Sequence, residues 1–322
     1  MKKILVTGGA GFIGSNFIRY FMNKYNNYKI INLDALTYAG NLNNLYDIKN
    51  NSNYTFVKGN ILDKQSVESI AKEGVDYIVN FAAQTHVDRS IKKSGDFVET
   101  NILGTSILLD VAKEYNIKKY IQISTDEVYG SLGKTGYFTE ETSLKPNNPY
   151  SASKASADLL VMSYYKTYNL PINITRCSNN YGPYQFPEKL IPLMIYNAYN
   201  NIKLPVYGDG LNIRDWIHVE DHCRAIDLVI HKGIIGEVYN IGGNNEKTNI
   251  DIVNKILNRL GKDKSLINFV EDRLGHDYRY AIDSTKIREE LSFEPKIRFE
   301  KGINDTIDWY LRNQKWLNNI LK

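Results

Sequence analysis

Short apolar runs rich in β-branched residues recur along most of the chain, separated by segments of helical length. The runs predict strands at Lys3–Thr7, Lys29–Asp34, Tyr54–Gly59, Tyr77–Phe81, Tyr120–Ser124, Ile172–Arg176 and Val238–Ile241. They are nearly continuous in apolar residues rather than alternating, which is typical of parallel strands with both faces covered. Strands that alternate with helices predict an α/β fold with a doubly wound parallel sheet of the Rossmann type.

The regular alternation ends after about residue 176, where turn-rich stretches such as Tyr181–Tyr184 and Tyr207–Gly210 begin. They interrupt helical patterns such as Asn249–Leu260. We therefore expect residues 1–176 to form the sheet domain and residues 177–322 to form mainly a smaller, substrate-binding lobe. Later segments, about 214–245, are expected to return to the first domain, so that the two parts interleave.

Composition and charge narrow the possible partners. The 322-residue chain is 43% hydrophobic and 24% charged, and its formal net charge of +4 is spread without long runs of like charge. Nucleic-acid and membrane partners are therefore not expected, although a small anionic substrate fits. Cys177 and Cys223 are too few for a disulfide framework, and no apolar run approaches the ~18 residues of a membrane span. A strand begins almost at the N-terminus, which leaves little room for a cleaved leader, so we expect a cytoplasmic protein.

A glycine-rich turn, Thr7-Gly-Gly-Ala-Gly-Phe-Ile-Gly14, follows the first predicted strand and opens a helix. Its glycines fit both G-x-G-x-x-G and G-x-x-G-x-x-G spacings. Glycine is needed because the turn is tight and a side chain would block a pyrophosphate, which the free N–H groups of the helix N-terminus would bind. Asp34 ends the second predicted strand, where a carboxylate accepts hydrogen bonds from an adenosine ribose and repels a 2′-phosphate. The pattern thus indicates NAD rather than NADP.

Tyr150 and Lys154 lie one helical turn apart in Tyr150-Ser-Ala-Ser-Lys154. A free tyrosine, with a pKa of about 10, is a poor base at neutral pH. The ammonium of Lys154 and the positive nicotinamide ring would stabilise the phenolate, and lowering its pKa by about three units requires roughly 4 kcal/mol. Tyr150 could then remove a proton from a sugar hydroxyl while hydride leaves the same carbon.

Thr125, Asp126 and Glu127 place a hydroxyl and two adjacent carboxylates directly after the apolar run Tyr120–Ser124. Two such carboxylates are commonly solvated or capping residues. Beside a Tyr/Lys pair in a nucleotide site, however, they provide an acid and a base for neighbouring carbons. The pattern therefore indicates oxidation coupled to elimination, and it leaves open which carboxylate is neutral at rest.

At these motifs the chain resembles the extended short-chain dehydrogenase/reductase family, and within it the nucleotide-sugar 4,6-dehydratases that act on dTDP-glucose. The resemblance covers nearly the full length. It rests on Thr7–Gly14, Asn80–Ser90, Ser124–Gly130, Tyr150–Lys154, Arg176–Tyr184, Arg214–Val219 and Asp272–Tyr280.

The resemblance implies a role for each of the five catalytic candidates. Tyr150, supported by Lys154, would act as the base while the hexose is oxidised at C4, and Thr125 would hydrogen-bond the C4 oxygen. Glu127 would remove the C5 proton, and Asp126 would protonate the departing C6 hydroxyl. Bound NAD would be regenerated in each turnover.

The resemblance also implies two sets of binding residues. The cofactor residues are Gly8, Gly11, Phe12, Ile13, Gly14, Asp34, Asn60, Ile61, Ala82, Ala83, Thr100, Tyr150, Lys154 and Asn180. The substrate residues are Thr85, His86, Thr125, Asn179, Lys189, Leu190, Arg214, Asn249, Arg273 and His276. Arg214 and Arg273 also have a physical rationale, because a sugar diphosphate needs fixed cations and a guanidinium group can bind it through paired hydrogen bonds.

Two departures from the family pattern leave the nucleotide base open. Gln84-Thr85-His86 stands where Glu-Ser-His is frequent, and the Gln-Thr-His version also occurs in relatives that act on UDP-glucose. Asn60 stands where an aspartate usually contacts adenine. UDP- and CDP-glucose therefore remain alternatives to dTDP-glucose. An NAD-dependent epimerase is a further alternative, although epimerases typically have small neutral residues in place of Asp126 and Glu127.

Two further expectations concern metals and assembly. His218 and His222 are one helical turn apart, but no third ligand stands nearby and Glu220 and Asp221 do not fit H-E-x-x-H, so no metal is expected. The resemblance implies a homodimer joined through helices of the nucleotide-binding domain.

Overall fold

The structure, a computed structural model, describes residues 1–321 and is built around a seven-stranded parallel sheet of order β10-β6-β5-β4-β1-β2-β3. Its strands are β1 (Lys2–Thr7), β2 (Tyr28–Asp34), β3 (Tyr54–Lys58), β4 (Tyr77–Asn80), β5 (Lys119–Thr125), β6 (Ile172–Cys177) and β10 (Val238–Ile241). These are the seven predicted strands, each matched to within one residue at either end. The order from β6 to β3 is that of a Rossmann fold, which places a ligand crevice at the switch between β1 and β4.

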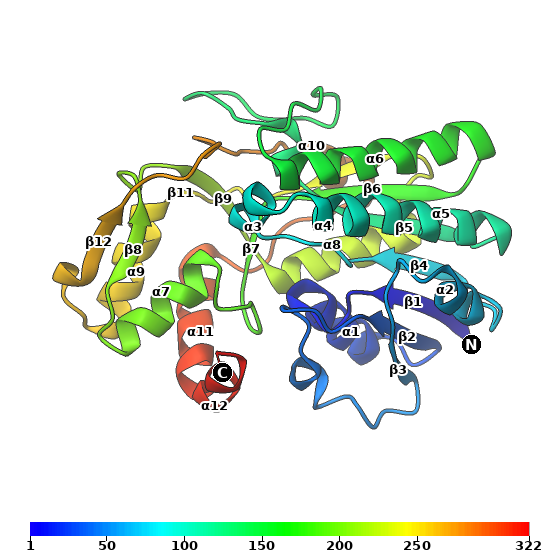
Figure 1. The fold of residues 1–322 in the computed structure, drawn as a ribbon, viewed down its shortest axis with the longest axis horizontal. Coiled ribbons are helices and arrows are strands. Elements are labelled where there is room, and N and C mark those ends of the chain that lie inside the picture. Colours follow the sequence, from blue (N-terminus) through cyan, green and yellow to red (C-terminus); the bar gives the residue numbers. More distant parts are fainter. Residues whose placement is uncertain (322) are drawn as a thin grey trace.

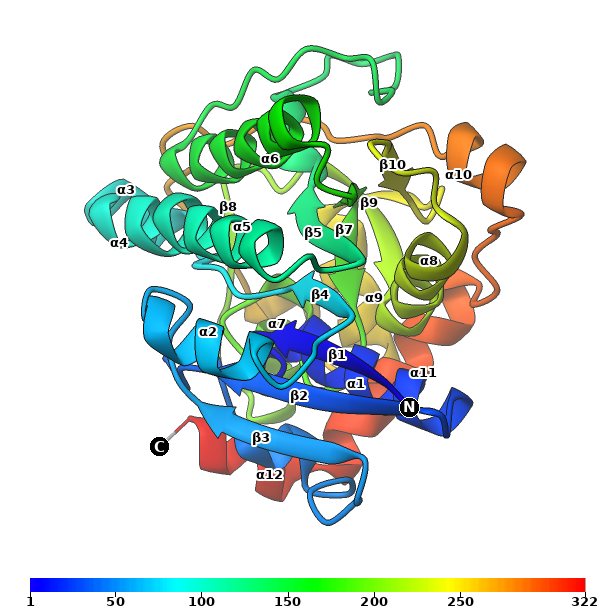
Figure 2. The same cartoon turned by 90° about the vertical axis from the view of Figure 1, so that its right-hand side faces the viewer.

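Helices cover both faces of this sheet (Figures 1 and 2). On one face α1 (Phe12–Lys24) packs beside α8 (Val219–Lys232), and on the other lie α2 (Lys64–Ala71), α5 (Gly104–Glu114) and α6 (Pro149–Tyr168). Shorter turns connect these elements, namely η1 (Leu42–Leu45), α3 (Val87–Lys92), α4 (Gly95–Phe97), η2 (Val98–Leu103) and η3 (Asp126–Tyr129). Because both faces are covered, the strands are apolar throughout, as their sequences predicted.

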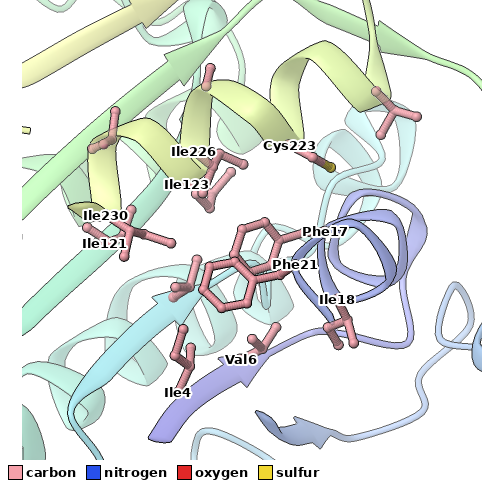
Figure 3. Close-up of a cluster of buried hydrophobic side chains, with 14 of the residues drawn as sticks. Ile4, Val6, Phe17, Ile18, Phe21, Ile121, Ile123, Cys223, Ile226 and Ile230 are labelled. Atoms are coloured by element: carbon pink, nitrogen blue, oxygen red, sulfur yellow. The ribbon is translucent and has the colours of Figure 1, made fainter. Parts of the chain in front are cut away.

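The core between α1, α8 and the sheet is drawn in Figure 3. Phe17 and Phe21 of α1 lie between Ile4 and Val6 of β1 and the apolar face of α8, and all four of these side chains are fully buried. The two phenyl ring centroids are 5.4 Å apart. This packing holds α1 against β1, so that the turn between them has a fixed position.

A second core belongs to the C-terminal lobe. Its helices are α7 (Leu190–Tyr199), α9 (Asn249–Leu260), α11 (Phe299–Arg312) and α12 (Gln314–Ile320). Its small sheets join β7 (Asn179–Tyr181), β9 (Ile213–His218) and β11 (Glu246–Thr248), and separately β8 (Leu204–Tyr207) and β12 (Ile267–Val270), with η4 (Lys264–Leu266) before β12. α9 has the bounds that its apolar pattern predicted.

The lobe and the sheet domain are interleaved, as the sequence predicted. After the lobe strand β9, the chain returns through α8 to β10 in the main sheet, and α10 (Thr285–Leu291) packs beside β10. The fold class is therefore confirmed, while the division at residue 176 stays a prediction. Among the helices of residues 1–321, none combines the length and apolar character that a membrane crossing requires.

Candidate active site

A pocket lies at the carboxyl ends of β1, β2, β4, β5 and β6, the edge of the sheet where a Rossmann fold binds its ligand. Every one of the fourteen predicted cofactor residues lines it, and so do Thr125, Asp126, Glu127, Tyr150 and Lys154. The structure therefore brings the glycine turn and the catalytic candidates into one continuous cavity.

The glycine turn is shaped so that side chains cannot replace its glycines. Gly8 has a φ of +69°, and a Cβ on Gly14 would lie 2.8 Å from the Cα of Gly9. α1 then begins at Phe12, and the N–H groups of its first turn have no acceptors within the helix. The turn thus provides the space and the donors that a pyrophosphate needs.

Asp34 lines the pocket at the end of β2 and is 7% exposed. One carboxylate oxygen accepts a hydrogen bond from the amide of Ala10 and the other from the amide of Leu36, both at 2.8 Å. A carboxylate has about four acceptor sites, so it can still receive the hydroxyls of a ribose. Asn60 and Ile61 also line the pocket, and the Oδ1 atom of Asn60 accepts from the amide of Leu62. All three predicted adenosine-binding residues thus line this pocket.

The segment after β5 holds the two carboxylates in different environments. Asp126 is 1% exposed, and its Oδ2 atom is buried without a hydrogen-bond partner. Its Oδ1 atom accepts from Thr125 Oγ1 at 3.3 Å. Burial, followed by the negative charges of Glu127 and Asp215, raises the pKa of Asp126 well above its ordinary value. Burial thus favours the protonated form of Asp126, which is the form that can donate a proton.

Glu127 is half-buried and faces the helix that carries the Tyr/Lys pair. Its Oε2 atom accepts a hydrogen bond from Ser151 Oγ at 3.3 Å. Its backbone amide donates to Thr125 Oγ1, also at 3.3 Å. Thr125 thus fixes the turn between the strand and η3, and the two adjacent carboxyl groups enter the same cavity with different access to water.

The N-terminus of α6 positions Tyr150 and Lys154. Asn148 caps the helix by accepting the amide of Ser151 at 2.9 Å, and Pro149 occupies the first turn. Both functional side chains are more than nine-tenths buried. Lys154 Nζ donates to the carbonyl of Ile123 at 2.6 Å.

The electrostatics of Tyr150 differ from the sequence-based expectation. Burial, and then the charge of Glu127, raise the pKa of Tyr150 well above its ordinary value, and burial lowers the pKa of Lys154. Among the described residues, no hydrogen bond joins Lys154 to Tyr150, and the ammonium of Lys154 donates to the carbonyl of Ile123 instead. The groups of the chain alone favour the neutral phenol.

The predicted substrate residues divide into two groups. Thr85, Thr125, Asn179 and Lys189 line the pocket, and Lys189 Nζ donates to the carbonyl of Thr85 at 2.9 Å. Six others are absent from its lining: His86, Leu190, Arg214, Asn249, Arg273 and His276.

Three of these six lie on the lobe side of the site. Arg273 is 3.8 Å from the carboxylate of Asp88, and His276 Nδ1 is 2.6 Å from a carboxylate oxygen of Asp272. Arg214 is 5% exposed, donates to the carbonyls of residues 213, 277 and 278, and stacks 4.3 Å from the ring centroid of Tyr280. The guanidinium of Arg214 is therefore held in a fixed position by backbone carbonyls of the chain itself, and its predicted contact with a substrate stays a prediction.

The other three begin helices. His86 accepts the amide of Arg89 as the N-cap of α3, and burial lowers its pKa. Leu190 is the first residue of α7 and packs against the lobe core, and Asn249 is the first residue of α9.

His218 and His222 form no metal-like pair. His218 accepts the amide of Glu220 at the start of α8, and the Nδ1 atom of His222 lies 2.9 Å from Asn180 Oδ1. Burial lowers the pKa of His218 to about 4 and that of His222 to about 3, so both rings are neutral at physiological pH. His222 thus orients Asn180, one of the predicted cofactor residues.

Several pocket residues were not predicted. They include Cys177, Ser178, Gln185, Phe186, Glu188 and residues of the loop after β2, such as Thr37 and Gly40. Cys177 could have been found, because it directly follows the predicted strand Ile172–Arg176 and pairs in register with Thr125. The others stand in turns that have no periodic pattern.

Comparisons with known proteins agree with this geometry. The family model described as GDP-mannose 4,6 dehydratase matches residues 5–306. A dTDP-glucose 4,6-dehydratase from Xanthomonas campestris is 50% identical, with 100% of this chain and 96% of the relative covered. A crystal structure of a dTDP-glucose 4,6-dehydratase from Bacillus anthracis in complex with NAD has a TM-score of 0.94 at 57% identity, covering 99% of this chain and 100% of the other.

A second solved structure is that of a dTDP-glucose 4,6-dehydratase from Streptomyces venezuelae with NAD and the ligand TYD bound. Its TM-score is 0.96 at 47% identity, and 99% of each chain is covered. The match over nearly the whole length, on a shared fold and with the expected motifs in one pocket, identifies this chain as a member of the GDP-mannose 4,6 dehydratase family.

Proposed function

We propose that this protein is an NAD-dependent hydro-lyase that converts dTDP-glucose to dTDP-4-keto-6-deoxyglucose. One observation carries the reaction type: the buried carboxyl group of Asp126, whose pKa is raised, stands beside Glu127 in the pocket that also contains Tyr150 and the glycine turn. An epimerase needs no such acid/base pair. The dTDP-glucose 4,6-dehydratases that resemble the chain over its full length support the choice of substrate.

The residues of the chain would act in three steps. Tyr150 removes the proton of the C4 hydroxyl, while Thr125 holds the C4 oxygen. The resulting 4-keto group acidifies C5, whose proton passes to Glu127. Asp126 gives its proton to the C6 hydroxyl, which leaves as water, and Glu127 returns a proton, exchangeable with solvent, to C5. Release of the C4 hydroxyl proton from Tyr150 to solvent and uptake of one proton by Asp126 then restore both groups. NAD held at the glycine turn would accept the hydride from C4 and supply it to C6, so that the net change is the loss of one water molecule.

The raised pKa of Tyr150 bears on the first step. Burial and Glu127 favour its neutral form, so it can act as a base only when a cation lies close to the phenol. The positive charge of an oxidised nicotinamide would meet this need, and it disappears after hydride transfer. Tyr150 would then keep its proton while elimination proceeds at C5 and C6.

The nucleotide end of the substrate would bind on the lobe side. Lys189 lines the pocket, and the charges of Arg273 and Glu127 both act on it. Arg273 and His276 lie beyond the pocket lining, which suits a diphosphate that extends from the sugar toward the lobe. Arg214 would support this site indirectly, through its stacking on Tyr280.

We further propose that the protein is a homodimer. Val98, Leu103 and Leu159 are 51%, 51% and 62% exposed, and they lie on η2 and α6, neighbouring elements on one face of the sheet domain (Figure 2). Exposed large apolar side chains on adjacent helices are typical of a subunit interface.

The function is tested by incubating the purified protein with dTDP-, UDP-, CDP- and GDP-hexoses and following the 4-keto product. We expect turnover with dTDP-glucose to exceed turnover with the others. Preferential turnover of UDP- or CDP-glucose would change the assigned base, and formation of no keto sugar from any of them would contradict the proposed reaction.

A further inference from the structure

The C-terminal helix α12 reaches back to the first part of the sheet domain. Both views place α12, in red, next to the blue N-terminal elements (Figures 1 and 2). The contact is specific, because Trp316 Nε1 donates a hydrogen bond of 2.9 Å to Asn44 Oδ1 in η1. These residues are far apart in the sequence, so the contact joins the lobe to the region around the glycine turn.

Asn44 is in turn hydrogen-bonded to the glycine turn. Its side chain is 2% exposed, and its Nδ2 atom donates to the carbonyl of Ala10 at 2.9 Å. The same carbonyl accepts the amide of Asn41 at 3.0 Å. At its other end, Ala10 donates its own amide to Asp34 Oδ2. A continuous chain of hydrogen bonds therefore runs from Trp316 through Asn44 and Ala10 to Asp34.

These hydrogen bonds fix the orientation of the peptide groups that would hold the cofactor. The carbonyl of Ala10 and the amide of Gly11 belong to one planar peptide unit, and Gly11 is the N-cap of α1. A rotation of that unit would turn the first N–H groups of α1 away from a pyrophosphate and would loosen Asp34. The pocket lining does not include Ala10, Asn44 or Trp316. These residues therefore influence the shape of the pocket indirectly, through the residues that line it.

The indole of Trp316 is itself held in place. Its ring packs at 5.1 Å from that of Trp309 and at 5.7 Å from that of Tyr184. Tyr184 has a φ of +68°, an uncommon conformation for a bulky residue, and the guanidinium of Arg19 lies 4.5 Å from its ring centroid. Arg19 also donates to the backbone carbonyl of Asn44. Asn44 is thus fixed from α1 and from α12 together.

We propose that α12 is a clamp that keeps the glycine turn closed on bound NAD, with Trp316 and Asn44 as its positioning residues. The inference rests on the NAD-dependent reaction proposed above. That reaction uses the same hydride twice, so a cofactor lost between the two transfers would leave an unreduced intermediate. A clamp that slows cofactor release therefore protects each turnover.

The test compares Trp316→Phe and Asn44→Ala with the wild type and with Trp309→Phe as the matched control. Trp309 belongs to the same aromatic cluster, but its indole makes no hydrogen bond to η1 within the described chain. The rate at which NAD leaves the purified protein is measured by stopped-flow competition, together with the NAD content after gel filtration. We expect Trp316→Phe and Asn44→Ala to release NAD about five- to tenfold faster than the wild type, because each variant loses at least one of the hydrogen bonds that connect Trp316 to Ala10. Added NAD should restore their turnover, and Trp309→Phe should release NAD as the wild type does.

Two results would overturn the clamp. One is wild-type NAD release by both Trp316→Phe and Asn44→Ala. The other is equally fast release by Trp309→Phe, which would show that aromatic packing and not the hydrogen-bond chain is responsible. A wild-type protein that binds no NAD at all would contradict the proposed function as well, so the two failures are distinguishable.

Discussion

Asp126 and Glu127 are neighbours in the chain but differ in burial. Asp126 lines the pocket but is 1% exposed, with one carboxylate oxygen unpaired, whereas Glu127 is half-buried and bonded to Ser151. Burial of Asp126 raises its pKa and so favours its protonated form. At the scale of single residues, this difference in burial supports the proposed roles of Asp126 as acid and Glu127 as base.

Substitution of either carboxyl group should separate oxidation from elimination. Glu127→Gln lacks the base for C5, and Asp126→Asn lacks the acid for the C6 hydroxyl, so each should lower turnover by about 10²–10⁴-fold. Both should still oxidise C4 in part. Reduced NAD should accumulate in a single turnover, as measured by its near-ultraviolet absorbance, while little 6-deoxy product forms.

Glu141→Gln is the matched control, because Glu141 is exposed and outside the pocket. It should behave as the wild type. Normal dehydration by Glu127→Gln would show that another group is the base.

The raised pKa of Asp126 also predicts a pH dependence of stability. Between the ordinary aspartate pKa of about 4 and the raised pKa, the folded protein holds a proton that the unfolded chain releases, so stability falls as pH rises through that interval. Asp126→Asn removes this penalty. Its Tm should exceed that of the wild type at neutral and alkaline pH, and the gain should vanish near pH 4 and below. A gain that is the same at every pH would contradict a raised pKa.

The sequence predicted candidate catalytic residues but not their protonation. Thr125, Asp126, Glu127, Tyr150 and Lys154 stand in two short motifs and can be recognised locally. The pKa of Asp126 depends also on Asp215 and Arg214, which are distant in the sequence. The guanidinium of Arg214 likewise donates hydrogen bonds to the carbonyl groups of residues 277 and 278. These residues are distant in the sequence, and no local pattern links them to Arg214.

At the scale of elements, the N-terminus of α6 is the clearest link between local structure and chemistry. Asn148 caps this helix through the amide of Ser151, and Tyr150 stands between these two residues. Ser151 Oγ lies 3.0 Å from Asn148 Oδ1 and 3.3 Å from Glu127 Oε2, so its single hydroxyl proton can be donated to either acceptor. The cap therefore positions the proposed base for C4 and the proposed base for C5 together.

Asn148→Ala should lower the free energy of unfolding by about 1 kcal/mol, which is typical for loss of an N-cap. It should also lower kcat more than it changes KM, because Tyr150 and Ser151 lose their common support. Denaturant unfolding and steady-state kinetics measure the two effects.

Asp63→Ala provides the comparison, since Asp63 caps α2 in the same way by accepting the amide of Ser66. It should lose a similar amount of stability while kcat stays near the wild-type value. Equal kinetic losses in both variants would show that the effect of Asn148 is one of general stability.

Elements could be predicted wherever one pattern dominates. Strands covered on both faces are apolar throughout, and their ends were predicted to within one residue. α9 was predicted because its apolar face is regular and it ends at Gly261. The pairing of the short strands β7, β9 and β11 could not be predicted, because three-residue strands such as β7 and β11 carry no periodic signal.

At the scale of the whole molecule, the lobe and the sheet domain meet around the pocket. Phe186, Glu188 and Lys189 come from the segment before α7, and they line the cavity opposite the glycine turn. Two hydrogen bonds through Asn44 connect α12 to the glycine turn, which forms part of the wall of the same cavity. Interleaving was predicted from the sequence, but these contacts between distant segments depend on packing that no local pattern encodes.

The proposed homodimer is also a property of the whole molecule. Leu159→Arg introduces a charge into the proposed subunit interface on α6, so the protein should change from dimer to monomer, which light scattering can measure as a halved mass. Ile234→Arg is the control, because Ile234 is similarly exposed but lies between α8 and β10. A wild-type protein that is already monomeric, or a Leu159→Arg variant that remains dimeric, would contradict the proposed interface.

The central claim is that oxidation at C4 and reduction at C6 are joined in one pocket by one bound cofactor. A single isotope measurement tests it most directly: dTDP-glucose deuterated at C4 is converted by the wild-type protein, and the product is examined by NMR and mass spectrometry. The account predicts that the deuterium moves from C4 to C6 of the 4-keto-6-deoxy product, while C5 acquires a hydrogen from solvent. A keto product whose C6 carries no deuterium would contradict it.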